Sequence, residues 1–569
     1  MADATYHVVA PGTQPAAGQP AHGRSVTAIL VAHGMGQQTP FQTLDDLVTG
    51  LRRYCRLPGL RGHRTDVKNV RAGQEILQRL EATLTLPDGT ERDVHIYEAY
   101  WAPLTEGKVS LRDVIEFLLR GGGSGTLHGL QPFKRWMFDK YVHFAAPVRT
   151  VLYLTVALGT VVSLVALNVI IFAVAAARAP VQSPPAWLSP ACFRDLTVIL
   201  NALVLVFAAF AALFGLSVAT RRMRGVRTVF GIATVVAFTS AVWATMASAV
   251  AAGMVLSFHV LSSSGELSFF DRLGWTSAVA ALDRVVDRWM FVLVAASTAV
   301  AALWWILGVM KNLPGALRRS PRATGLTVAG FVAIAGLLAF FALTLYEPFA
   351  SGISSHPWRL GLAWPLVLVA AAIVRWFLIQ FMGDVAAYVQ PQVLDRFAEV
   401  RKKIKDTVWR KARAVYSLPY DDVILIGHSL GSVIIYDALN RLIVEEQVNT
   451  DHAPRDVAKR TRLLLTFGSP LDKTAFIFGV LGRRAEAREA LAAAVQPLIA
   501  DESVRPRWIN IHSPWDPISG SLDFYDLPDR SNRHAVENVR DPDATTLLLA
   551  HLEYWKNPTL FRTILEALR

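Results

Sequence analysis

The residues best suited to chemistry form the pentapeptide Gly427-His428-Ser429-Leu430-Gly431. A continuous apolar run, residues 423–426, precedes it, and apolar residues at helical spacing follow it. A G-x-S-x-G sequence between a strand and a helix places the serine on a sharp turn, with its hydroxyl exposed at the end of a sheet. Glycines at both ends suit that turn, since a side chain there would collide with the neighbouring strand or helix. Ser429 is therefore a candidate nucleophile, and the alternative is a serine that only caps the helix.

The pentapeptide resembles the nucleophile elbow of the α/β-hydrolase superfamily, and of lipases and esterases in particular, with Ser429 as nucleophile. A second match lies upstream, where the apolar run 26–32 leads into His33-Gly34-Met35-Gly36. In the hydrolases that the chain resembles, such an HG-containing loop donates one backbone N–H to the oxyanion hole. The resemblance thus implies that the N–H groups of Met35 and Leu430 hold the negative oxygen of a tetrahedral intermediate. The supporting residues would be His33, Gly34, Gly427, His428 and Gly431. A glycine turn with a structural histidine is the alternative for the upstream loop.

The same resemblance implies a catalytic acid after the serine in the chain. Asp516 is the first choice, because it lies in the loop after the apolar run 507–511, which is expected to be a strand. Asp472, in the loop after the run 462–467, is the second choice. Asp523 and Asp526 are expected to be surface residues.

A catalytic histidine should follow the acid in this superfamily, and only His534 and His551 remain downstream of Asp516. His551 lies near the end of the chain and resembles the terminal histidine loop of many lipase-like proteins. His534 lies in a polar segment and is the alternative. Histidine suits the role of base because its unperturbed pKa near 6.5 lets it take and return a proton near neutral pH. The expected triad is Ser429, Asp516 and His551.

These residues require a sheet that brings separate loops to one edge. The apolar runs 26–32, 423–426, 462–467 and 507–511 are typical of buried parallel strands, and therefore of an α/β fold. The segments 81–86 and 91–101 flank Pro87-Asp88-Gly89-Thr90 and predict a hairpin. Helices are expected over 43–54, 108–120 and 384–417.

The composition is too apolar for an ordinary soluble enzyme, at 53% hydrophobic and 18% charged residues in a chain of 569. Six apolar spans are each long enough to cross a hydrocarbon core of about 30 Å: residues 151–175, 196–218, 229–258, 290–310, 326–345 and 360–381. Basic residues gather in alternate loops, which predicts cytoplasmic termini. The expected fold class is an α/β-hydrolase sheet with flanking helices, split by an inserted transmembrane bundle of six helices.

Four regions follow from this interpretation. They are a disordered tail over 1–25, the first part of the hydrolase with an interfacial segment over 26–145, a transmembrane domain over 146–382 and the second part of the hydrolase over 383–569. The expected setting is a bacterial inner membrane, with the hydrolase part in the cytoplasm. The net charge of +12 is attributed to loops at the lipid surface rather than to nucleic-acid binding. Two cysteines are too few for a disulfide framework or a thiolate metal site, and no metal or cofactor is expected.

The function expected from the sequence is that of a membrane-anchored serine hydrolase that cleaves esters of lipid-like acyl groups. The bilayer and a hydrophobic ester are its expected partners. An acyltransferase with the same triad is the first alternative, because another alcohol can replace water in resolving an acyl-enzyme. The second alternative is a hydrolase-like domain that only regulates a membrane protein.

Overall fold

The structure is a computed structural model that describes residues 6–8, 26–36, 38–54, 65–86, 88–106, 108–117, 133–137, 140–144, 388, 395–449, 455–475, 495–525, 535–546 and 549–569. Contacts divide the chain into two compact units, the first Met1–Leu152 with Phe377–Arg569 and the second Tyr153–Trp376. All of the described residues belong to the first unit. The two ends of the chain therefore fold together.

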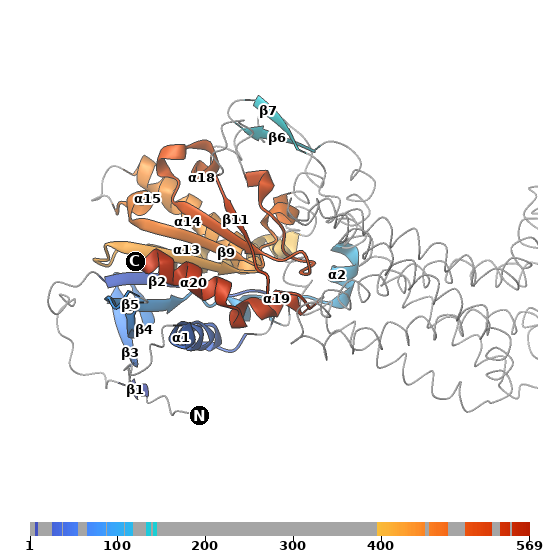
Figure 1. Cartoon of the computed structure of the whole chain (residues 1–569). Helices are drawn as coiled ribbons and strands as arrows, with labels where there is room; N and C mark the ends of the chain where they lie inside the picture. Colours follow the sequence, from blue (N-terminus) through green and yellow to red (C-terminus); the bar gives the residue numbers. More distant parts are fainter. Residues whose placement is uncertain are drawn as a thin grey trace, which may run out of the picture. The chain divides into compact units, whose positions relative to one another are not determined.

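A nine-stranded mixed sheet forms the centre of this unit (Figure 1). From edge to edge its strands are β1 (Tyr6–Val8), β3 (Thr65–Ala72), β4 (Glu75–Thr85), β5 (Glu91–Glu98), β2 (Val26–Ala32), β8 (Asp422–His428), β9 (Thr461–Phe467), β10 (Arg507–His512) and β11 (Glu537–Arg540). Strand β4 is antiparallel to β3 and β5, and the other neighbours are parallel. The turn between β4 and β5 contains Gly89 at φ 85°, which glycine adopts without strain. The hairpin predicted around residues 87–90 is confirmed.

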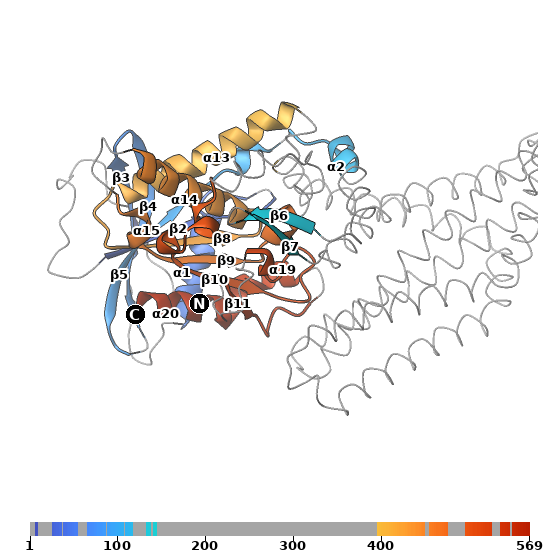
Figure 2. The same ribbon diagram turned by 90° about the horizontal axis from the view of Figure 1, so that it is seen from above.

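Helices cover both faces of the sheet, as the almost continuous burial of β2, β8 and β9 requires (Figures 1 and 2). The helices that bear on the site are α1 (Gln42–Tyr54), α13 (Asp395–Tyr416), α14 (Leu430–Val448), α19 (Ala550–Glu553) and α20 (Pro558–Leu568). Helices α13 and α14 pack together, and α1 packs with α20. At the second contact Gly50 lies so close to the Phe561 ring that a Cβ there would overlap it.

Strand β2 joins the two ends of the chain within the sheet. It pairs with β5 on one side and with β8 on the other, and Ala32 lies opposite Gly427. Because the two strands are parallel, the loop after β2 and the turn after β8 leave the sheet side by side. Ligand sites of open α/β sheets form at such carboxyl ends of strands.

The fold class expected from the sequence requires correction. Among the described residues, no helix is long and apolar enough to cross a membrane, and no six-helix bundle is present. The longest described helices, α13 and α14, have 22 and 19 residues, but each carries charged side chains and packs against the sheet unit. The six expected spans over residues 151–381 lie outside the described residues.

Two smaller segments of the expected regions also contain strands. Residues 6–8, within the expected disordered tail, form strand β1 and pair with β3, while residues 9–25 lie outside the described part. Residues 133–144, within the expected interfacial segment, contain the strands β6 (Phe133–Met137) and β7 (Lys140–Phe144), which form an antiparallel pair. The shorter helix α2 (Leu111–Phe117) lies within the expected helix 108–120.

Candidate active site

Ser429 lies on a strained turn between β8 and α14. Its backbone has φ 52° and ψ −128°, a conformation that non-glycine residues rarely adopt. A Cβ at Gly427 would come within 2.5 Å of the Ser432 Cα, and one at Gly431 would overlap the carbonyl oxygens of Ala32 and His33. The turn is therefore possible only with glycine at both positions. Its geometry is held by hydrogen bonds from the Ser429 N–H to the Phe467 carbonyl (3.0 Å) and from the Ser432 hydroxyl to the Gly427 carbonyl (2.9 Å).

The hydroxyl of Ser429 is buried and unpaired. The residue is fully buried, and its Oγ has no hydrogen-bond partner in the described part of the chain. A buried polar group without a partner costs about 1–3 kcal/mol of folding free energy. Such groups are rare in folded proteins and are found where a site awaits a ligand or stores strain.

The loop after β2 touches this serine directly. A Cβ at Gly34 would lie 2.8 Å from both the Ser429 Cβ and the His428 Nδ1. Met35 follows at once, and no backbone hydrogen bond of its N–H or of the Leu430 N–H is found among the described residues. The N–H of Leu430 is one of the first in helix α14, where the helix leaves N–H groups free and its dipole favours negative charge. The two N–H groups expected to form an oxyanion hole therefore both lie beside Ser429.

The start of this loop is fixed by His33. Its Nδ1–H donates to the Gly34 carbonyl (2.8 Å), and its Nε2 accepts from the backbone N–H of Trp101 (3.0 Å). The Trp101 indole N–H donates to the His33 carbonyl (3.2 Å), and the two rings stack with centroids 4.8 Å apart. Burial lowers the pKa of His33 to about 4, so its imidazole is neutral near pH 7. His33 thus holds the loop and supplies no charge.

The end of the loop is fixed by residues 98–101, the segment that contains Trp101. The Glu98 carboxylate accepts the N–H of Phe41 (2.7 Å), and the Tyr100 hydroxyl donates to the Gln38 carbonyl (2.8 Å). Phe41 is a non-glycine residue at φ 69°, so this carboxylate holds a strained backbone. Burial raises the pKa of Glu98. Residues 98–101 thus hold the loop 33–41 at both of its ends.

We expect the buried imidazoles of His33 and His428 to make the protein less stable in acid. Burial lowers the pKa of His428 to about 3 and that of His33 to about 4, whereas histidine in the unfolded chain titrates near 6.5. Their stabilising contribution is complete above about pH 6.5 and is lost as pH falls towards 4, because the unfolded state then binds more protons. Urea unfolding at pH values between about 7.5 and 4 would measure this slope. In the variant His33→Gln, the number of protons taken up on unfolding, which this slope measures, should fall by up to about one. An unchanged slope would show that His33 is not a buried neutral imidazole.

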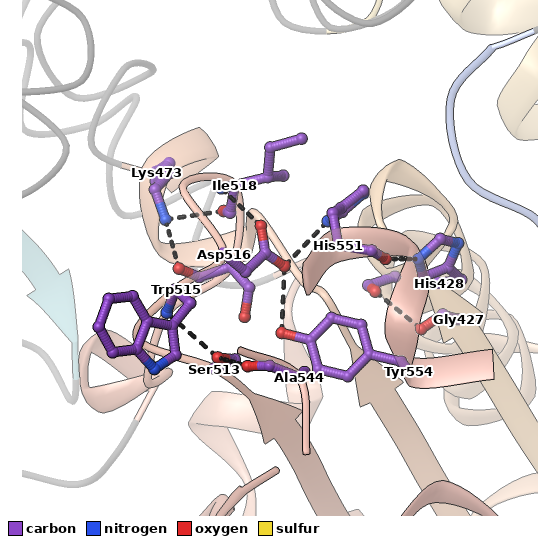
Figure 3. Close-up of polar contacts among 12 residues, drawn as sticks. Gly427, His428, Lys473, Ser513, Trp515, Asp516, Ile518, Ala544, His551 and Tyr554 are labelled. Carbon is purple, nitrogen blue, oxygen red and sulfur yellow. Dashed lines mark hydrogen bonds and ion pairs between the residues drawn. The ribbon is translucent and has the colours of Figure 1, made fainter. Parts of the chain in front are cut away.

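Asp516, in the loop after β10, and His551, in the turn before α20, lie together (Figure 3). The His551 Nδ1–H donates to the Asp516 Oδ2 (2.9 Å), and the Ile518 N–H donates to the Asp516 Oδ1 (2.9 Å). Asp516 and His551 are 2% and 4% exposed, so water scarcely competes for these bonds. Burial alone would raise the pKa of Asp516, but His551, the Ile518 N–H and the Lys473 ammonium outweigh it and lower the pKa. Asp516 is therefore an ionised carboxylate that orients the His551 ring.

The structure describes only some of the alternative residues considered for the acid and the base. In the described part of the chain His551 bonds to Asp516, and no contact joins it to Asp472. The carboxylate of Asp523 is exposed and accepts the hydroxyl of Ser521 (2.8 Å), as expected of a surface residue. His534 and Asp526 lie outside the described residues.

Ser429 and His551 are neighbours in space without a direct hydrogen bond. His428 links them, because its Nε2–H donates to the backbone carbonyl of His551 (3.1 Å) and the two imidazole centroids are 5.0 Å apart. A Cβ at Gly468, which has φ 58°, would lie 3.1 Å from the His551 Cε1 and 3.3 Å from the His428 Cδ2. The structure thus brings the serine turn and the His551–Asp516 pair to one place. The Ser429 hydroxyl and the His551 ring are not hydrogen-bonded to each other in this structure.

Several residues that support the pair were not predicted from the sequence. The Lys473 ammonium donates to the carbonyls of Ile518 (2.7 Å) and Ser519 (2.9 Å) and so anchors the acid loop (Figure 3). The Tyr554 hydroxyl donates to the Asp516 Oδ2 (3.1 Å). Tyr554 lies one helical turn after His551, and that spacing could have indicated a shared target. Lys473 has no local signal of this kind.

The turn that carries His551 is tied down at both ends by carboxylates. Before it, the Thr546 hydroxyl (2.7 Å) donates to Glu553. After it, the Asn557 amide donates to the buried Asp541 (2.9 Å), where α20 begins. His551 therefore lies on a fixed turn rather than on a free loop.

No group of three or more histidine, cysteine, aspartate or glutamate side chains that could hold a metal ion occurs among the residues that the structure describes. Comparison of the chain with protein-family models, curated proteins and solved structures gave no match. The function of the protein is therefore inferred from the geometry of the site.

Proposed function

We propose that this protein is a serine ester hydrolase of the α/β-hydrolase type, with Ser429 as nucleophile, His551 as base and Asp516 as the orienting acid. One observation carries the proposal. A buried, unpaired serine hydroxyl lies on a strained elbow against an HG-containing loop, with a buried histidine–aspartate pair on the neighbouring loops. Most buried hydroxyls in folded proteins have a hydrogen-bond partner, so an unpaired one at a strained elbow favours a nucleophile.

The proposed reaction has two halves. His551 accepts the proton of the Ser429 hydroxyl as the oxygen attacks the ester carbonyl, and the imidazolium that forms is stabilised by Asp516. The N–H groups of Met35 and Leu430 bind the oxyanion of the tetrahedral intermediate. The intermediate collapses, the bond to the alcohol breaks, and His551 protonates the departing alcohol. Water, deprotonated by His551, then attacks the acyl-enzyme and releases the carboxylic acid and Ser429.

The Ser429–His551 hydrogen bond belongs to the complex with substrate in this proposal. Catalytic hydrogen bonds are often long or poorly aligned without substrate and shorten when it binds. His428 already holds the main chain of His551 beside the elbow, so the proposed bond requires movement of side chains rather than of the main chain. This movement is favoured because it gives the buried Ser429 hydroxyl a hydrogen-bond partner.

The surroundings of the base favour an apolar ester. Leu549 and Leu552 lie on either side of His551 in the chain and are 42% and 49% exposed. Exposed leucines beside the proposed base in the chain favour an apolar substrate, because ligand sites bind hydrophobic groups and orient them by a few polar groups. We therefore propose esters with hydrocarbon acyl chains as the substrate class.

A fluorophosphonate probe tests the nucleophile, because it reacts covalently with an activated serine. Wild-type protein is expected to be labelled, and Ser429→Ala is expected to lose labelling completely. The control is Ser417→Ala, which removes a serine hydroxyl that donates to the Ala414 carbonyl (2.7 Å) at the end of α13, away from the elbow; its labelling should equal that of wild type. Labelling that persists in folded Ser429→Ala, or that is absent from folded wild type, would contradict the proposal.

A further inference from the structure

The hydroxyl of Tyr554 has an unusual position for a buried tyrosine. It donates to the same carboxylate oxygen, Oδ2 of Asp516, that accepts the Nδ1–H of His551 (3.1 Å and 2.9 Å). The ring is fully buried, and its edge faces Phe467 with centroids 6.0 Å apart. Figure 3 shows both donors converging on this one oxygen from the same turn of the chain.

The convergence follows from helical spacing. His551 belongs to α19, and Tyr554 begins the 3-10 turn Tyr554–Lys556 that continues it. Residues three apart on a helix face the same side, so one rigid turn carries both donors. The turn itself is fixed by Glu553 and Asp541 through the contacts described above. A displacement of either donor would therefore displace the other.

We infer that Tyr554 is a positioning residue of the proposed triad, which sets how strongly Asp516 holds the protonated form of His551. The inference depends on the proposed function, because it assigns Tyr554 a part in the same proton transfer. A hydrogen bond to a carboxylate stabilises its charge and uses one of its lone pairs. With that donor in place, Oδ2 attracts the imidazole proton less strongly than a carboxylate bound only by His551 and the Ile518 N–H.

Among the residues that the structure describes, few ionisable groups surround this oxygen. Those that face Asp516 are His551, Lys473 and Tyr554 itself, and His428 lies next to His551. Asp541 is the other carboxylate near the Tyr554 hydroxyl. Lys473 stays in place when Tyr554 changes, because it is held by the Ile518 and Ser519 carbonyls. A change at Tyr554 therefore acts on the Asp516–His551 pair.

The variant Tyr554→Phe tests this inference, because it removes one oxygen atom and keeps the ring. Without the phenol, Asp516 holds the imidazolium more tightly, and His551 becomes an available base only at higher pH. We expect the acidic limb of the kcat/KM profile for p-nitrophenyl butyrate to move upward by roughly 0.3–1 pH unit, the shift equivalent to one net hydrogen bond. An unchanged limb in folded Tyr554→Phe would overturn the inference.

The matched control is Tyr416→Phe. Tyr416 is also fully buried, and its hydroxyl contacts the Thr461 hydroxyl (2.6 Å) at the amino end of β9, the end opposite to the site. This variant should leave the limb unmoved. A loss of packing or stability would affect both variants, whereas a shift of the limb should be confined to Tyr554.

A second change keeps the test decisive if Tyr554→Phe does not fold. Incorporation of 3,5-difluorotyrosine at position 554 retains the ring and the hydroxyl and makes the hydroxyl a stronger donor. The limb should then move downward, opposite to the expected effect of phenylalanine. No shift with the fluorinated residue would also overturn the inference. Activity that survives Ser429→Ala would instead refute the proposed function, so the two failures are distinguishable.

Discussion

Replacing Asp516 by asparagine is expected to lower kcat/KM by about 10⁴-fold and to leave the protein folded. The carboxylate accepts three donors: the His551 Nδ1–H and the Tyr554 hydroxyl at Oδ2, and the Ile518 N–H at Oδ1. An asparagine has a single acceptor oxygen, so its NH₂ group faces one of these donors. If the NH₂ faces His551, the imidazole must carry its proton on Nε2. It then cannot accept the proton of Ser429.

The variant Asp472→Asn is the matched control, since Asp472 was the second choice for the acid. It should change kcat/KM by less than about tenfold. A large loss of kcat/KM for Asp472→Asn with a small one for Asp516→Asn would instead identify Asp472, in the loop after β9, as the acid. Circular dichroism and thermal unfolding of both variants show whether the loss is one of chemistry or of fold.

Replacing Gly34 by alanine should lower kcat by about 10²–10³-fold, the effect of losing one oxyanion donor. The added Cβ would meet the Ser429 Cβ and the His428 Nδ1 at 2.8 Å, a separation that real Cβ atoms do not show. The elbow is held by its own hydrogen bonds, so the loop must move, and the N–H of Met35 moves with it. KM should change less than kcat, because the lost contact is made with the transition state.

Gly520→Ala provides the comparison for this second prediction. A Cβ at Gly520 meets only the Lys473 Nζ, at an ordinary 3.6 Å. Its activity should stay within a few-fold of wild type. Equal activity of Gly34→Ala and Gly520→Ala would contradict the assignment of the loop after β2 to the oxyanion hole.

The parts of the site that follow from local sequence could be predicted. The serine turn was recognised from its glycines and from the apolar run before it. Each glycine avoids a steric clash with a residue nearby in the chain or with a neighbouring strand. The pairing of His551 with Asp516 followed from chain order in the superfamily that the chain resembles. The bounds of β2 agree with the apolar run 26–32, since burial on both faces leaves a continuous apolar signature.

The supports of the site could not be predicted, because they join residues far apart in the sequence through single hydrogen bonds. Glu98 binding Phe41 and Lys473 binding Ile518 leave no periodic pattern. The strained φ of Phe41 has no sequence signal either, since only glycine usually marks such a position. The transmembrane bundle expected from the apolar spans and the basic loops is not found among the described residues, where no helix is long and apolar enough to cross a membrane. There, apolar side chains are instead buried in the sheet and its helices.

The position of β2 between β5 and β8 has a consequence for biosynthesis. When the ribosome has completed β5, β2 can pair on one side, but its other partner, β8, begins only at Asp422. At about 5–20 residues per second, translation of the intervening segment takes on the order of tens of seconds. Throughout that interval a largely apolar strand presents open backbone donors and acceptors, the kind of surface that seeds aggregation. Nascent chains of this protein should therefore depend on a chaperone that shields the β2 edge until β8 emerges.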